Sequence, residues 1–214
     1  MSDKCRLLHQ YFNGMEKLSF PFANKDIPQN GIYILFEKGE HAHDTDRIVR
    51  VGTHTGENQL RSRLRQHFLK ENKDRSIFRK NIGRALLNKK DDPFLEHWEL
   101  DLTTRKAKEK YNFSIDHDKQ KEIENEVTKY IQNNFSFVVF PVVEKDKRLE
   151  IEQKLISTIS LCSECAPSED WFGHYSPKKK IRESGMWLVN GLYKEPMSEK
   201  DMEWLMELLK ISKN

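Results

Sequence analysis

Two short runs of apolar residues, at 31–36 and 48–52, constrain the fold of this 214-residue chain more than any other feature. Within each run the side chains alternate with the period of two that a β-strand requires, and a charged, histidine-containing segment separates the runs. The pattern predicts a hairpin in which Val49 and Val51 share one face and Arg50 lies on the other. Arg50 can then lie beside Tyr33, where a guanidinium would favour the ionised form of the phenol.

The other periodic segments predict an α+β fold, with one domain that carries peripheral additions. The order is one helix, the hairpin, two helices, an insertion, a third strand, a helix and a C-terminal extension. This order predicts a small antiparallel or mixed three-stranded sheet flanked by helices, with helical additions at both ends. Helices are expected within 1–26, at 60–70, 76–88, 119–134 and 148–162, and from Ser198 onward, and further strands at 94–102 and 135–143.

The charge of the chain is concentrated in one region. Residues 61–90 contain eleven Lys and Arg against two acidic residues, although the net charge of the whole chain is only +3. Such a local excess predicts a polyanionic partner, and two solvated helical faces are the alternative explanation. The chain has no signal-peptide pattern and no run of about 18 uncharged apolar residues, so we expect a cytoplasmic protein without a membrane partner.

Three cysteines do not predict a disulfide framework. Cys162 and Cys165 form one C-x-x-C motif, and Cys5 is a poor candidate partner for it, so we expect these cysteines to be structural. The loop between the two hairpin strands contains His41 and His43 together with two aspartates. We expect a solvated loop there, and a metal site is the less favoured reading.

Arg63 and His67 lie four residues apart in the helix that follows the hairpin. They should share a face that borders the apolar stripe without entering the core. Arg61 and Arg65 form a similar pair on the other flank, so spacing alone does not choose between the pairs. Histidine is the residue suited to proton transfer near neutral pH, and it favours the first pair.

These motifs, taken in order, resemble the GIY-YIG nuclease family. The resemblance rests on Gly31-Ile32-Tyr33, on Arg50-Val51-Gly52 in place of the second triplet, and on Arg63 with His67. It implies a nuclease core at 29–162 with an insertion at about 89–134, preceded by a helical addition at 1–28 and completed by an extension at 163–214. The sequence departs from the family pattern in a longer loop between the triplets and in Arg50, which replaces the second tyrosine.

The family has a metal-binding glutamate on a later helix, and residues 149–156 fit that description. Glu150 lies four residues before Lys154, the favourable order for an exposed ion pair, whereas Glu152 faces the apolar side of the helix. We therefore prefer Glu152. Asn190 is the best match to a family asparagine, and the surrounding segment, 183–192, resembles restriction-type members.

The resemblance implies that Tyr33 acts as the base, Arg63 holds the phosphate, His67 accepts or relays a proton, and Glu152 binds one Mg²⁺ or Mn²⁺ ion. Double-stranded DNA is the expected partner, and a homodimer would suit palindromic sites. We expect a metal-dependent DNA endonuclease of the restriction or defence type. The alternatives are a catalytically impaired binding module, a repair or mobile-element nuclease, and a small-molecule phosphodiesterase. The expected DNA-binding residues are Arg61, Arg65, Arg79, Lys80, Arg84, Lys178, Lys179, Lys180 and Arg182.

Overall fold

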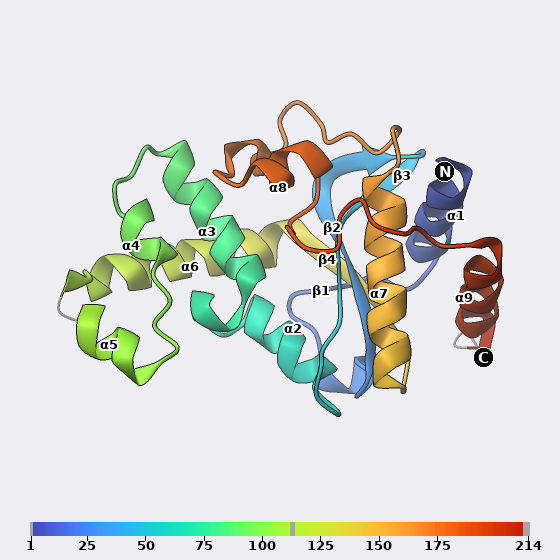
Figure 1. Cartoon of the computed structure of the whole chain (residues 1–214), viewed down its shortest axis with the longest axis horizontal. Helices are drawn as coiled ribbons and strands as arrows, with labels where there is room; N and C mark the ends of the chain where they lie inside the picture. The colour runs from blue at the N-terminus through green and yellow to red at the C-terminus, as the bar shows by residue number, and fades with distance from the viewer. Residues whose placement is uncertain (1, 112–113, 212–214) are drawn as a thin grey trace.

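The computed structural model describes residues 2–111 and 114–211, and within them a twisted sheet lies between two groups of helices (Figure 1). The sheet has the order β1-β4-β2-β3, and every pair of neighbouring strands is antiparallel. The strands are β1 (Leu18–Ser19), β2 (Gly31–Ala42), β3 (Thr45–Gly52) and β4 (Phe135–Pro141). The α+β fold is confirmed, and the sheet gains a short fourth strand at one edge.

Helices of very different length make up most of the rest of the described chain. The α-helices are α1 (Ser2–Asn13), α2 (Leu60–Phe68), α3 (Ile77–Lys89), α4 (Leu95–Glu99), α5 (Arg105–Tyr111), α6 (His117–Asn134), α7 (Lys145–Ser160), α8 (Lys179–Ser184) and α9 (Glu199–Ile211). Short 3-10 helices span Asn24–Asp26, Lys73–Arg75 and Phe172–Tyr175. None of the helices in the described residues is long and apolar enough to cross a membrane.

The alternation of β2 divides the apolar core between the two faces of the sheet. Ile32 and Ile34 pack with buried side chains of α1, α7 and α9 on one face. Tyr33 and Leu35 pack with those of α2, α3 and α6 on the other. Figure 1 shows these two groups of helices on opposite sides of the strands. A side chain that points from β2 therefore meets one group of helices or the other, according to its position in the sequence.

A bulge in β3 changes the predicted alternation of the hairpin. Leu35 pairs with Arg50 but Phe36 pairs with Ile48, so Val49 has no partner of its own. Val49 consequently joins the core beside α2 and α3, whereas Val51 joins the core beside α7. The prediction that both valines share a face is wrong. The extra residue shifts the strand register by one, so residues on the two sides of the bulge no longer follow a single alternation.

The strand predicted at 94–102 is also wrong, because this segment forms the short helix α4. Phe94 and Trp98 are both buried four residues apart, which is a helical spacing. The Trp98 ring lies over Gly83 of α3, where an added Cβ would be 2.3 Å from Cζ2, and its indole N–H donates to the Lys80 carbonyl at 2.9 Å. Contact with α3 therefore decides the conformation of this segment.

Candidate active site

Tyr33 and Arg50 lie on the same face of the hairpin, as the sequence predicts. Arg50 is opposite Leu35 in the strand register, one pleat away from Tyr33, and its Nε donates to the phenolic oxygen at 3.4 Å. The phenolic oxygen also lies 2.8 Å from Nε2 of His67 on α2. Three residues from three separate elements thus meet at one hydroxyl group, which is fully buried with the rest of Tyr33.

The glycines of the two triplets provide the space that this arrangement needs. Gly52 is directly opposite Tyr33, and a Cβ at that position would lie 2.1 Å from the tyrosine hydroxyl oxygen. Gly31 lies against β4, where a Cβ would be 2.2 Å from the carbonyl oxygen of Phe140. Any larger residue at Gly52 would displace the hydroxyl from His67, so this glycine belongs to the site through its lack of a side chain.

His67 is completely buried, which corrects the expectation that it borders the core. Its ring is fixed on both sides, by Tyr33 at Nε2 and by the Ser76 hydroxyl at 2.7 Å from Nδ1. Ser76 is the N-cap of α3, and this second contact ties the ring to that helix. Burial lowers the pKa of His67 well below its ordinary value, and the positive charges of Arg63, Arg50 and Arg79 lower it further. The imidazole is therefore neutral at pH 7, and its Nε2 can accept the hydrogen bond of the tyrosine hydroxyl.

The Arg50 guanidinium is buried at the edge of the sheet, with 5% of the residue exposed. Its Nη1 donates to the carbonyl of Trp187, and the group lies 5.2 Å from the centre of the Phe78 ring. Trp187 in turn donates its backbone N–H to the Val49 carbonyl at 2.8 Å. The C-terminal part of the chain therefore docks on the open edge of β3 and fixes Arg50 there.

Glu152 lies on α7, on the other face of the sheet, and its carboxylate reaches the end of β3. Its Oε1 accepts the backbone N–H of Thr53, the residue after β3, at 3.0 Å. Burial raises the pKa of the Glu152 carboxyl, and the charges of Arg50 and Arg63 oppose that increase. Glu150, by contrast, is exposed and forms ion pairs with two lysines of its own helix. Glu152 is thus the inward glutamate, as the helical spacing predicts.

A cavity of about 410 Å³ adjoins these groups and is bordered by Arg50, Glu152 and Asn190. Asn190 is exposed on its rim, so the structure brings this predicted residue to the same cavity as Glu152. Arg63 borders a second cavity of about 240 Å³ beside α2. Its Nη1 donates to the Arg75 carbonyl at 3.1 Å, and its charge is close enough to influence both His67 and Glu152.

Three of the predicted DNA-binding residues are engaged inside the protein, and we remove them from the expected surface. Arg79 is fully buried and pairs with Glu124 at 2.6 Å. Arg84 pairs with Glu99 at 2.6 Å, and the Lys80 ammonium donates to the Glu99 carbonyl at 2.7 Å. Most of their donors pair with acidic and carbonyl groups of the 89–134 insertion, so these three residues are not free to bind a polyanion.

The other predicted basic residues remain nearer to solvent. Arg61 and Lys178 are half-buried, the first donating to the Ile27 carbonyl at 2.7 Å and the second lying 3.7 Å from Glu99. Exposed guanidinium and ammonium groups are carried by Arg65, Lys179, Lys180 and Arg182. These exposed groups are the ones able to reach a phosphate.

Sequence reasoning did not identify Thr53, Ser76 or Trp187 as parts of the site. Thr53 and Trp187 act through backbone groups, which any residue offers, so their identity gives no signal. Ser76 is an N-cap just before a predicted helix, and such a hydroxyl was a detectable structural signal but not a functional one.

The fold and these side chains define a compact α+β domain that gathers a tyrosine, a neutral histidine, arginines and one carboxylate at a sheet edge. A family model for the GIY-YIG domain matches residues 3–213, and the chain therefore belongs to the GIY-YIG domain family. This membership indicates a nuclease-type function and supports an enzyme of the endonuclease class. No curated protein and no solved structure gives a significant match to the chain.

Proposed function

We propose that the protein is a divalent-metal-dependent endonuclease that cleaves double-stranded DNA. The observation that carries this proposal is the convergence of side chains from four separate elements, in which Arg50 and Glu152 border one cavity and Arg50 also contacts the buried Tyr33–His67 pair. A core that needed only packing would not place two guanidinium groups and a carboxylate beside a tyrosine–histidine pair.

The proposed chemistry needs a base, a stabiliser of phosphate charge and a proton acceptor. Tyr33 takes a proton from the attacking water, while its own hydroxyl proton passes along the 2.8 Å contact to Nε2 of His67. The attacking oxygen forms the new bond to phosphorus, and the bond to the leaving oxygen of the sugar breaks. Arg50 and Arg63 supply fixed positive charge against the negative charge that accumulates on the phosphate.

Glu152 fits the requirements of a Mg²⁺ or Mn²⁺ ligand. It presents a hard carboxylate oxygen donor at the cavity wall, and its orientation is fixed by the Thr53 N–H. Mg²⁺ is commonly held by one or two carboxylates together with water and phosphate oxygens, so one protein ligand is sufficient. When bound, such an ion supplies Lewis-acid stabilisation of the phosphate.

Within this class we favour a restriction or genome-defence role. The support is the likeness of residues 183–192 to restriction-type members and the docking of this segment on β3, where Trp187 holds Arg50. A homodimer acting on palindromic DNA stays a prediction.

A catalytically impaired DNA-binding module is the second candidate, and two observations favour it. Arg50 stands where the family has a tyrosine, and Tyr33 has no exposed surface. A base must meet its substrate, so this candidate is correct if Tyr33 never becomes accessible to water.

The test is incubation of purified protein with plasmid and whole phage DNA in the presence of Mg²⁺ or Mn²⁺. The proposal expects cleavage that disappears in the Tyr33→Phe variant, which keeps the fold but lacks the hydroxyl. DNA binding with no cleavage in either metal would favour the binding module.

A further inference from the structure

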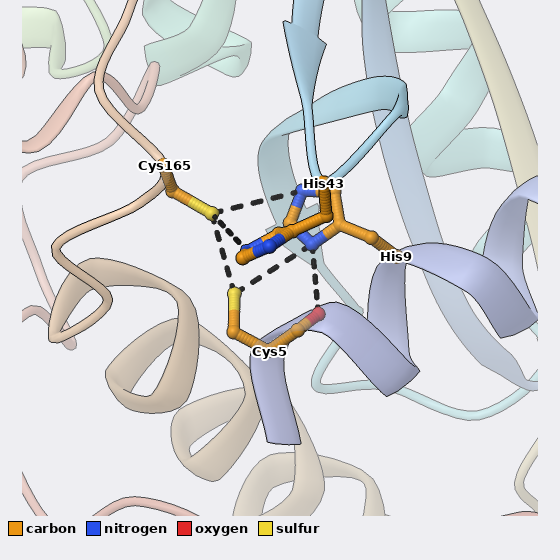
Figure 2. A group of neighbouring side chains, drawn as sticks. All are labelled: Cys5, His9, His43 and Cys165. Atoms are coloured by element: carbon orange, nitrogen blue, oxygen red, sulfur yellow. Dashed lines mark hydrogen bonds between the residues drawn. The ribbon is translucent and has the colours of Figure 1, made fainter. Parts of the chain in front are cut away.

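A second cluster of reactive side chains lies away from the candidate active site, where three distant segments meet (Figure 2). Cys5 comes from α1, His43 from the turn between β2 and β3, and Cys165 from the turn that follows α7. The Sγ atoms of Cys5 and Cys165 are 3.3 Å apart, and Cys165 Sγ is 3.2 Å from Nε2 of His43. The expectation that Cys5 is a poor partner for the C-x-x-C motif is therefore wrong.

His43 is held in the manner of a metal ligand and is not part of a solvated loop. It adopts a left-handed backbone conformation in the hairpin turn, with φ 52°, and its side chain is only 1% exposed. Its Nδ1 lies 3.4 Å from a carboxylate oxygen of Glu164, which leaves Nε2 to face the sulfurs. A carboxylate on the outer ring nitrogen orients the inner nitrogen of a histidine toward a metal. His41, near the end of β2, has a side chain that is 70% exposed.

The separations are within about 0.5 Å of those in a tetrahedral zinc site, and the shortest are smaller than the site requires, so the side chains would move apart slightly on binding. Zinc bonds of about 2.3 Å to sulfur and 2.0–2.1 Å to nitrogen place neighbouring ligand atoms roughly 3.3–3.8 Å apart. The sulfur–sulfur and sulfur–nitrogen separations here are 3.3 and 3.2 Å, and Cys162 Sγ lies 3.5 Å from the same His43 nitrogen. A disulfide needs about 2.05 Å, so the cysteines are in contact without being bonded to each other.

The fourth ligand must be chosen between His9 and Cys162. His9 lies within 4.8 Å of the other three groups, but both of its ring nitrogens already face backbone partners. Its Nδ1 is 2.9 Å from the Cys5 carbonyl, and its Nε2 accepts the Ile48 N–H at 3.1 Å, so the ring has no free lone pair.

Cys162 has the features that His9 lacks. It belongs to the C-x-x-C turn with Cys165, and its Sγ lies 3.5 Å from Nε2 of His43, the nitrogen that also faces Cys165. Two sulfurs from one such turn are a common half of a structural zinc site.

We propose that one structural zinc ion is bound by Cys5, His43, Cys162 and Cys165. His9 packs beside these residues without binding the ion. The ion would link α1 and the hairpin turn to the segment that follows α7, the helix that also carries Glu152. Because ligand binding to the folded state alone adds to stability, the free energy of metal binding becomes free energy of folding. This proposal stands independently of the nuclease proposal.

The experiment is elemental analysis of the full chain, purified without a histidine tag under reducing conditions. We expect one zinc ion per chain, loss of zinc in Cys5→Ser, Cys162→Ser and His43→Ala, and retention in His9→Gln. The matched control is His41→Ala, at an exposed position two residues before His43, and this variant should keep its zinc. Removal of zinc by a chelator should lower the melting temperature, and added zinc should restore it.

Cobalt substitution of the wild-type protein keeps the test decisive if a cysteine variant fails to fold. Tetrahedral Co²⁺ bound to three thiolates should give strong visible bands and a thiolate charge-transfer band. Wild-type protein that contains no zinc and gives no such spectrum would overturn the site. A Cys5–Cys165 disulfide in the protein before reduction would do the same. Zinc lost from His9→Gln but kept in Cys162→Ser would overturn the ligand set.

Discussion

The pair Glu152→Gln and Glu150→Gln separates a metal-binding carboxylate from a surface one on the same helix. Gln keeps an oxygen that can accept the Thr53 N–H, so Glu152→Gln removes charge while preserving the contact seen at 3.0 Å. Even outer partners of metal ligands typically contribute about 10–100-fold to activity, so loss of the ligand itself should cost at least about 100-fold. Glu150 is 43% exposed, and an exposed helical ion pair contributes only about 0.3–0.5 kcal/mol, which is less than about threefold.

The same substitution should change stability in the opposite direction. Burial raises the pKa of the Glu152 carboxyl above its value in the unfolded chain. The folded state then binds the proton more tightly, so this group destabilises the protein as pH rises through its folded pKa. Glu152→Gln removes that effect and should raise the melting temperature at pH 7, with a difference that shrinks as the pH is lowered toward the ordinary carboxyl range.

The assays are single-turnover cleavage with Mg²⁺ and thermal unfolding across pH in buffer without added divalent metal. A chelator is left out of the unfolding assay, because it would also remove the proposed zinc. Equal loss of activity in both variants would refute the assignment of Glu152. A lower melting temperature for Glu152→Gln at pH 7 would refute the account of its burial.

Three further substitutions test other parts of the site. Gly52→Ala should abolish cleavage, as seen in a nicking assay, because its Cβ would overlap the tyrosine hydroxyl. Gly39→Asn, at an exposed position of β2 with φ 87° and open space around it, should not. Arg50→Met should move the acidic limb of the pH–rate profile to higher pH, because the guanidinium opposes the increase that burial causes in the pKa of Glu152. Arg50→Lys should have a smaller effect, because it keeps the charge. An equal loss of rate at every pH would instead indicate that Arg50 contacts the phosphate. Arg182→Ala should reduce the slope of log K against log salt by about 0.9 in a binding titration, whereas Arg84→Ala should lower the melting temperature and leave that slope unchanged.

The parts of the site that follow short-range rules could be predicted from the sequence. Strand alternation placed Tyr33 and Arg50 together, and the helical spacing of Glu152 separated it from Glu150. The bulge at Val49 could not be predicted, because it follows from how two strands pair and not from either strand alone. It is nonetheless the reason that Ile48 and Arg50 face opposite sides of the sheet.

The remaining failures share a cause, which is that the deciding partners lie far away in the sequence. Arg79 and Arg84 resemble a phosphate-binding surface until Glu124 and Glu99 are found beside them. Cys5 resembles an isolated thiol until it meets Cys165, which follows α7 and lies 160 residues later in the sequence. Charge and thiol counts report what a segment contains, whereas pairing depends on tertiary contacts that one sequence does not reveal.

The most direct test of the central claim is Mg²⁺-dependent cleavage of phage DNA by the wild-type protein, compared with Tyr33→Phe and Glu152→Gln. The account predicts cleavage by the wild type alone, with DNA binding retained in both variants. Tyr33→Phe removes only the hydroxyl that contacts His67, and Glu152→Gln only the charge of the carboxylate. Cleavage by Tyr33→Phe at the wild-type rate would contradict the account, because the hydroxyl held by His67 and Arg50 would then have no part in the reaction.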